Sequence, residues 1–207
     1  LFIKDINLVN QNITRTILNA ASTGVYNIRR GTLSTSYKSR ISVIASMDPQ
    51  AGPLNPELLS QFGLRVLVKG LDSEAQRIEA YQRAVAFQKN PSAFVGQFFE
   101  ATETARKEVQ AARDRLPSVE IPEKIMRQSV HLLQAQKVAS LRAQIALLQG
   151  SLALAAVDGR FRVELDDIKY IAPMVIRLRQ SPFADKFFEY CSQEDLLINK
   201  SLNDILD

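Results

Sequence analysis

The sequence predicts an α/β segment followed by an all-α segment, and three features of the chain support this division. Short apolar runs typical of buried strands flank a helical run near the start of the chain. Turn residues then cluster at Asp48-Pro49, Gly52-Pro53 and Asn55-Pro56. After Gly70 the composition changes to amphipathic runs rich in Ala, Glu and Arg, which favour helices. The α/β segment is expected at 1–70, and the helical part is expected to divide into segments at 71–116, 117–180 and 181–207.

The α/β segment begins with a strand–helix–strand pattern. The runs LFI and ISVIAS are the two predicted strands, and NQNITRTILNAAS lies between them. In this middle run Ile13, Ile17 and Ala20/Ala21 recur at helical spacing, and Gly24 ends the predicted helix. Strands joined through a helix pair in parallel, so the sequence predicts a crossover of this kind.

The all-α segment is divided by prolines and capping residues. Asp72 or Ser73 begins the first predicted helix, and Asn90–Pro91 ends it. Pro117 and Pro122 bracket a linker before the next helices. A bundle-facing stripe is predicted from Leu141, Ile145, Leu148, Leu152 and Ala155, and Asp166–Asp167 begins the last helix before the tail. The tail places Phe183, Phe187, Tyr190, Leu196, Leu197, Leu202 and Ile205 at helical intervals, and we expect it to dock on the helices or on a neighbour.

Composition excludes several classes of protein. One cysteine and one histidine leave no disulfide framework and no multi-histidine metal site. No apolar run approaches the roughly 20 residues that span a bilayer, which predicts a soluble, cytoplasmic protein without a membrane span. The net charge of +4 is spread along the chain, so nucleic acid is not the expected partner. The chain starts at Leu1 inside a predicted strand, and we expect it to be part of something longer.

Polar residues follow both predicted strands, at the edge where parallel sheets bind ligands. The first strand ends in Lys4-Asp5-Ile6-Asn7, and the second ends in Met47-Asp48-Pro49. No phosphate loop of the form G-x-x-x-x-G-K-[ST] occurs in the sequence. Together with the ELLSQFGL run, the LRAQ segment at 141–144 and the DGR turn at 158–160, these residues carry a family resemblance.

The chain resembles the AAA+ ATPase subunits of magnesium chelatase and their relatives from residue 1 to about 180. The resemblance implies the C-terminal part of an AAA+ P-loop NTPase core at 1–70, a helical connection at 71–116 and a helical lid at 117–180, followed by the tail at 181–207. It places Lys4 where the family has the aspartate that holds Mg²⁺, and Asp5 where it has the water-activating glutamate. Asp48 falls at the sensor asparagine, and Gln61 falls at the arginine that reaches a neighbour's site. Arg142 matches the lid arginine that grips phosphate, while Gln144 replaces the aspartate that follows it.

These replacements predict a weakened site. A lysine repels the cation that a carboxylate would hold, an extra carboxylate at 48 repels phosphate, and Gln61 brings no charge to stabilise the leaving phosphate. Since the two strands are neighbours, Lys4 and Asp48 are expected either to form an ion pair where Mg²⁺ would sit or to be separately solvated. The segment 26–40 resembles the family's hairpin, and its basic residues Arg29, Arg30, Lys38 and Arg40 are either a contact surface or ordinary solvated surface.

Three functions remain open at this point. The first is a non-hydrolysing or regulatory subunit that assembles with AAA+ ring neighbours, with an ATPase or with a von Willebrand-type domain partner. The second is an active ATPase that couples ATP hydrolysis to Mg insertion into a porphyrin, with its upstream half outside this chain. The third is a purely structural interaction module. ATP and Mg²⁺ are implied by the family, but no cofactor and no metal site is expected for this chain alone.

Overall fold

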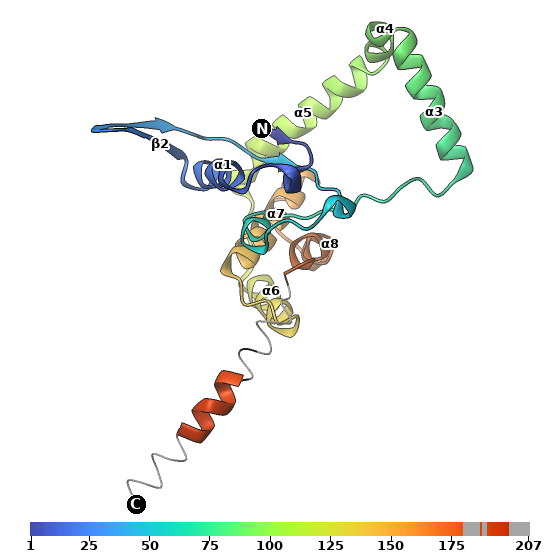
Figure 1. The fold of residues 1–207 in the computed structure, drawn as a ribbon. Coiled ribbons are helices and arrows are strands. Elements are labelled where there is room, and N and C mark those ends of the chain that lie inside the picture. The colour runs from blue at the N-terminus through green and yellow to red at the C-terminus, as the bar shows by residue number, and fades with distance from the viewer. Residues whose placement is uncertain (180–186, 188–189, 199–207) are drawn as a thin grey trace, which may run out of the picture. The chain divides into compact units, whose positions relative to one another are not determined.

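The computed structural model describes residues 1–179, 187 and 190–198. The chain, drawn as a ribbon in Figure 1, forms two compact units, Leu1–Gly63 and Leu64–Asp207. Each unit has its own hydrophobic core. The tail predicted at 181–207 lies largely outside the described residues, although residues 190–198 are helical. Among the described residues, no helix is both long and apolar enough to cross a bilayer.

The first unit contains the predicted parallel crossover. Strand β1 (Phe2–Ile3) pairs in parallel with β4 (Ile44–Ala45), and helix α1 (Gln11–Thr23) lies between them in the chain. The unit is completed by the 3₁₀ turns η1 (Ile6–Leu8) and η2 (Pro49–Ala51), the strands β2 (Val25–Arg30) and β3 (Leu33–Lys38), and the short helix α2 (Pro56–Ser60). Its core consists of Ile6, Leu18, Leu54 and Leu58. The confirmed crossover places the residues that follow β1 and β4 at one edge of the sheet.

Helix α1 begins and ends where local chemistry dictates. The side chain of Asn10 accepts a hydrogen bond from the backbone N–H of Asn12 at 2.9 Å, and Gly24 ends the helix in the left-handed conformation with φ 71°. Of the residues predicted at helical spacing, Ala20 is buried and Ile17 is half-buried, but Ile13 is not on the buried face. The helix buries Thr14, Leu18 and Ala20, whereas Ile13 is exposed. Packing against the small core of this unit therefore selects a face that the apolar spacing alone does not identify.

The second unit is helical. Its elements in chain order are α3 (Glu74–Lys89), α4 (Pro91–Gly96), α5 (Phe99–Arg115), η3 (Leu116–Ser118), α6 (Glu123–Ala135), α7 (Leu141–Val157) and α8 (Leu165–Ile176). Figure 1 shows α3 leading away from the bundle and α5 returning to α7. The core is formed mainly by α6, α7 and α8, and its fully buried members include Leu147, Val163 and Val175. Helix α3 buries none of its residues, and its apolar residues Ile78, Tyr81 and Val85 are exposed although they recur at helical spacing.

Helix α7 packs through small side chains. Its buried residues are Ala143, Leu147, Ser151, Ala155 and Ala156, while the predicted stripe residues Leu141 and Ile145 are exposed. The prediction was wrong for those two positions because α7 is apolar on nearly every side, which leaves the spacing ambiguous. The structure instead turns the small residues inward, where they allow close approach of α8.

Gly150 lies where α8 comes close to the backbone of α7. A Cβ atom built on Gly150 would lie 2.8 Å from Cγ2 of Ile171 on α8. Gly150→Ala should therefore destabilise the second unit by about 1–3 kcal/mol through overpacking, partly offset by the better helix propensity of alanine. Urea unfolding followed by circular dichroism measures the effect. Gly96→Ala is the matched control, because no atom lies within 4 Å of its added methyl group, and a loss of equal size in both variants would contradict the packing argument.

The N-terminus of α8 is fixed by a buried carboxylate. Asp167 is 2% exposed, and its two oxygens accept hydrogen bonds from Arg160 at 2.8 and 2.5 Å. It also accepts the backbone N–H of Glu164 at 2.8 Å, which forms a capping box. Burial would raise the pKa of Asp167, but the hydrogen bonds from Arg160 and Glu164 outweigh burial and lower it. The ion pair therefore anchors the turn between α7 and α8.

Candidate functional site

Lys4 and Asp5 directly follow β1, at the sheet edge where the resemblance places the metal site. The Lys4 side chain is 78% exposed, and its Nζ atom lies 3.9 Å from Oδ2 of Asp5. Asp5 adopts the left-handed conformation, with φ 50° and ψ 55°. Its backbone N–H donates to the hydroxyl of Ser46 at 3.2 Å, which ties it to the segment after β4. This sheet edge therefore carries an ammonium–carboxylate pair between sequence neighbours.

Asp48 has a local role. Its carboxylate accepts the backbone N–H of Gln50 at 2.9 Å and caps η2. Within the part of the chain that the structure describes, no ion pair joins Lys4 to Asp48. Of the two alternatives, the Lys4–Asp48 ion pair is therefore wrong, and Lys4 is solvated at the strand end. Lys4 lies next to Asp5 and Asp48 is used as a helix cap, and a lysine that is this exposed gains little from reaching a second carboxylate.

Asn7 is a residue at this sheet edge that the sequence analysis did not assign to the site. Its side-chain amide donates to the backbone carbonyl of Asp48 at 3.1 Å and to that of Gly52 at 2.9 Å. The side chain thus holds the turn after β4 against the turn after β1. The available sequence signal was its place in the polar run that ends the first strand.

Asn7 offers a stability test of this arrangement. Asn7→Asp should destabilise the first unit by about 2 kcal/mol, because a carboxylate would face two carbonyl oxygens and lose both donated bonds. Amide hydrogen exchange in residues 1–63 measures the loss. Asn12→Asp is the matched control, since Asn12 lies exposed in the first turn of α1, where a negative charge is neutral or mildly favourable. Equal exchange rates in the Asn7 variant and the unmodified protein would contradict this role.

The donor set at this sheet edge does not fit Mg²⁺. The ammonium group of Lys4 follows β1, where the resemblance implies a metal-binding carboxylate. Asp5 lies 3.9 Å from that ammonium group, and Asp48 is engaged as a cap. The described residues contain no group of three or more His, Cys, Asp or Glu side chains that could hold a metal ion. Gln61 follows α2 and offers only a neutral amide.

Arg142 belongs to the second unit, where it lies exposed in the first turn of α7 behind the Ser140 cap. It is close enough to Arg179 to act on it electrostatically. Burial first and the charge of Arg142 second lower the pKa of Arg179. The structure thus places Arg142 beside other arginines at the end of α8. Lys4, Asp5, Asp48 and Gln61 all belong to the first unit.

Arg65 is a second residue that the sequence analysis missed. It is only 8% exposed, and its guanidinium donates to the carbonyls of Arg177 at 2.9 Å and Leu178 at 2.7 Å. The backbone N–H of Arg65 donates to the backbone carbonyl of Met174 at 2.8 Å. Burial and, second, the charge of Arg179 lower the pKa of Arg65 to about 10. Arg65 therefore fastens the chain that follows Gly63 onto the C-terminal end of α8, where carbonyl groups favour a cation.

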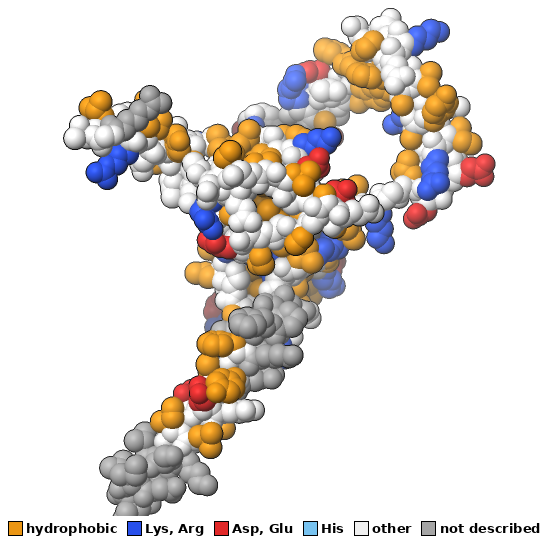
Figure 2. Space-filling model, in the orientation of Figure 1, with side chains coloured by type: hydrophobic (Ala, Val, Ile, Leu, Met, Phe, Trp, Pro, Cys, Tyr) orange, Lys and Arg blue, Asp and Glu red, His pale blue; other side chains and the backbone are white. Residues whose placement is uncertain are grey.

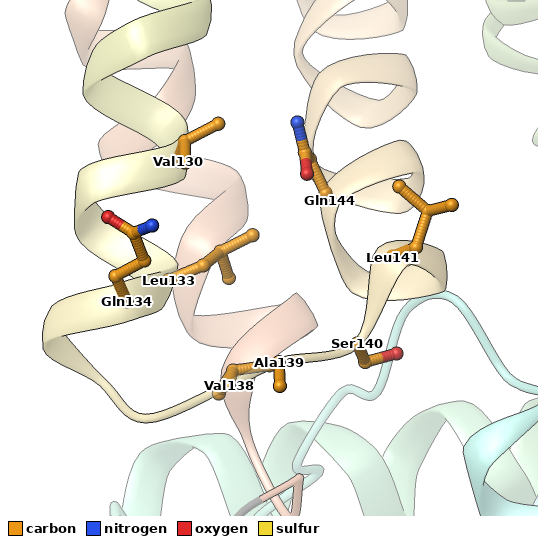
Figure 3. A pocket seen from close by; sticks show the side chains of 8 residues that line it. All are labelled: Val130, Leu133, Gln134, Val138, Ala139, Ser140, Leu141 and Gln144. Atoms are coloured by element: carbon orange, nitrogen blue, oxygen red, sulfur yellow. The ribbon is translucent and has the colours of Figure 1, made fainter.

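A pocket of about 240 Å³ lies between α6 and α7 (Figure 3). Figure 3 shows side chains from α6 and α7 on its two sides, with the connecting loop below them. The lining residues are Val130, Leu133, Gln134, Val138, Ala139, Ser140, Leu141 and Gln144. The lining is mostly apolar and carries no charged side chain, so it offers no cation to a phosphate group.

Comparison with known proteins shows what this chain is similar to. The family model of the AAA lid domain matches residues 126–197. A magnesium-chelatase subunit ChlI homolog from Methanocaldococcus jannaschii is 32% identical over 185 residues, which cover 88% of this chain and 51% of that protein. The magnesium-chelatase 38 kDa subunit of Rhodobacter capsulatus is 32% identical over 184 residues, with 88% of this chain and 53% of that protein covered. The chain thus spans about half the length of these curated relatives.

A solved structure supports the fold. The crystal structure of an ATPase candidate from Cytophaga hutchinsonii matches with a TM-score of 0.63 at 18% identity, covering 86% of this chain and 57% of that one. At this identity the match speaks for the fold alone. Together with the lid match and the chelatase relatives, it confirms the predicted α/β-then-helical architecture. The chain is therefore magnesium-chelatase-like and consists of the C-terminal portion of an AAA+ module with its AAA lid domain.

Proposed function

We propose that this chain is part of a magnesium-chelatase-like subunit. That subunit does not hydrolyse ATP by itself and acts by assembling with AAA+ neighbours. The observation that carries the proposal is the exposed ammonium group of Lys4 at the carboxyl end of β1, 3.9 Å from Asp5. Phosphoryl transfer in NTPases depends on a metal ion held at this kind of strand end. A lysine there supplies positive charge but cannot coordinate Mg²⁺.

Two further residues support the proposal. The family resemblance implies a neutral, water-orienting amide at position 48, and this chain has a carboxylate there, which caps η2. Gln61 stands where the resemblance implies an arginine that serves a neighbour, so this subunit brings no cation to the next site through that position. Arg142, by contrast, matches the family's lid arginine, and we propose that it contacts the phosphates of any bound nucleotide.

Thermal unfolding separates the three functions that the sequence leaves open. The polypeptide that the gene encodes is heated with ATP in Mg²⁺, with ATP in EDTA and without ATP, and its ATP hydrolysis is measured in parallel. The proposal expects turnover below about 0.01 per second, far under the typical enzyme rate of about 10 per second. A purely structural module shows no ATP-dependent shift in Tm, whereas ATP binding without hydrolysis raises Tm.

Assembly is tested by sedimentation velocity at several protein concentrations. We expect a species larger than one chain, either alone or with an AAA+ neighbour, and we expect its formation not to require Mg²⁺. Magnesium-dependent ATP turnover near 1 per second by the unmodified protein would overturn the proposal in favour of an active ATPase.

A further inference from the structure

The β2–β3 hairpin has two chemically different faces. Its strands pair antiparallel from Val25↔Lys38 to Arg30↔Leu33, and Gly31 in the two-residue loop has φ 60°, as in a type II′ turn. Directly opposed residues share a face and alternate along each strand. One face therefore carries the mainly apolar set Tyr26, Ile28, Leu33 and Tyr37, with Thr35, and the register puts Arg30 at its turn end, opposite Leu33. The other carries the polar set Asn27, Arg29, Ser34, Ser36 and Lys38, with Val25.

Both faces are open to solvent. All six residues of β3 are exposed, with Leu33 75% and Tyr37 54% exposed, and Tyr26 on β2 is 40% exposed. Figure 2 shows hydrophobic and basic side chains on different sides of this hairpin. A two-stranded ribbon with an exposed apolar face and two open backbone edges is marginally stable by itself and is a template for a further strand.

The charge of the hairpin has one sign. Residues 6–47 contain five cations, namely Arg15, Arg29, Arg30, Lys38 and Arg40, and no Asp or Glu. Arg15 pairs with Glu57, outside the hairpin, at 2.9 Å. Arg29, Lys38 and Arg40 make no ion pair with any described residue. The polar face thus presents cations that an acidic partner would neutralise.

The alternation favours a protein segment over nucleic acid. A nucleic-acid strand is usually held by cations on its phosphates and aromatic rings on its bases within one groove. Here Tyr26 and Tyr37 lie on the face opposite Arg29 and Lys38, so one strand of nucleic acid does not meet both sets. An extended peptide that adds to a hairpin edge places alternate side chains on both faces.

We propose that the β2–β3 hairpin binds an acidic extended segment of another protein, which adds as a further strand. The apolar side chains of that segment extend the tyrosine face, and its alternating carboxylates lie beside Arg29 and Lys38. The proposal concerns the hairpin alone and holds whether or not the protein hydrolyses ATP. Failure of either proposal can therefore be recognised without the other.

The test uses labelled twelve-residue peptides and the full chain, with binding followed by fluorescence anisotropy. One peptide alternates Glu with Val and Tyr, and a composition-matched peptide carries the same residues in blocks. We expect the alternating peptide to bind at least about tenfold more tightly than the block peptide. Its affinity should fall between 50 and 200 mM salt, because the contacts on the polar face are ionic.

A charge swap supplies the specific control. Arg29→Glu with Lys38→Glu should weaken binding at least about tenfold, and an alternating Lys peptide should then bind this variant in place of the Glu peptide. Lys89→Glu with Lys107→Glu makes the same change on exposed helices of the second unit and should leave the affinity unchanged. Tyr37→Ser should weaken binding with little change in its salt dependence, because it removes apolar contact only. Hydrogen exchange of residues 25–38 checks that each variant keeps the hairpin.

Several results would overturn the proposal. These are equal affinity for the alternating and block peptides, failure of the Lys peptide to rescue the charge-swapped variant, or equal weakening by the control variant. Tighter binding of a twelve-nucleotide poly-dT strand than of the acidic peptide would replace the protein partner with single-stranded nucleic acid. No binding of any of these probes would also refute it.

Discussion

Replacing Lys4 with Asp, Asp48 with Asn and Gln61 with Arg together should raise ATP turnover about a thousandfold over the unmodified protein. Lys4→Asp returns a carboxylate to the strand end that would hold Mg²⁺, and Asp48→Asn removes a charge that repels phosphate. An arginine supplied to a neighbour's site is worth about 10³–10⁵ in rate by itself. A thousandfold corresponds to about 4 kcal/mol of activation free energy. The measurement is steady-state phosphate release by the polypeptide that the gene encodes.

Single substitutions show how much each of the three positions contributes to the gain in turnover. Lys4→Asp alone should make nucleotide binding depend on Mg²⁺ without reaching the triple variant's rate. Lys69→Asp reverses a charge on an exposed residue after the first unit and should leave turnover unchanged. A triple variant that stays at the background rate while its Tm rises with Mg-ATP would show that these three positions do not limit hydrolysis.

Asp167→Asn should destabilise the second unit by about 3 kcal/mol or more. The carboxylate is 2% exposed and accepts two hydrogen bonds from Arg160 and one from Glu164. An amide in its place would turn a donor toward the guanidinium and remove the buried one of its carboxylate partners. Because Arg160 keeps Asp158 at 2.8 Å, the cost lies at the lower end of the about 3–5 kcal/mol found when a buried pair is broken. Urea unfolding and the hydrogen exchange of residues 163–176 measure the loss.

The neighbouring residue provides the control and the pH dependence provides a second readout. Asp166→Asn makes the same chemical change at an exposed ion pair with Lys169 and should cost no more than about 0.5 kcal/mol. The pKa of Asp167 is lower in the folded state than its unfolded value of about 3.9. Its stabilisation is therefore fully present above about pH 5 and is lost as pH falls through the folded pKa. A difference between wild type and Asp167→Asn that persists unchanged at pH 2 would contradict this linkage.

Local chemistry made much of the fold predictable. The parallel crossover of β1, α1 and β4 follows from the strand–helix–strand pattern of the sequence, in which Gly24 ends the helix. The break at Asn90–Pro91 also lies where predicted, because a proline disfavours helix in the preceding residue and Asn90 caps the next helix. These signals are contained within a few residues, so no knowledge of tertiary contacts is needed to interpret them.

Features decided by tertiary packing were not predictable in this way. The inward face of α7 is set by the close approach of Ile171 to Gly150, which apolar spacing does not reveal in a helix that is apolar nearly all round. Arg65 is a single cation in the apolar run LRVLV, and only the structure shows that the end of α8 supplies its carbonyl partners. At the candidate site, residue types were predicted to disfavour Mg²⁺, but the capping role of Asp48 and the bridging role of Asn7 depend on turn geometry.

Single-turnover hydrolysis tests the central claim most directly, because excess protein over labelled ATP removes product release from the measured rate. With the unmodified polypeptide in Mg²⁺, the claim that Lys4 replaces the magnesium-holding carboxylate predicts γ-phosphate release no faster than in buffer alone. Cleavage of one equivalent of ATP within minutes, abolished by chelating Mg²⁺ and retained in Lys4→Ala, would contradict it.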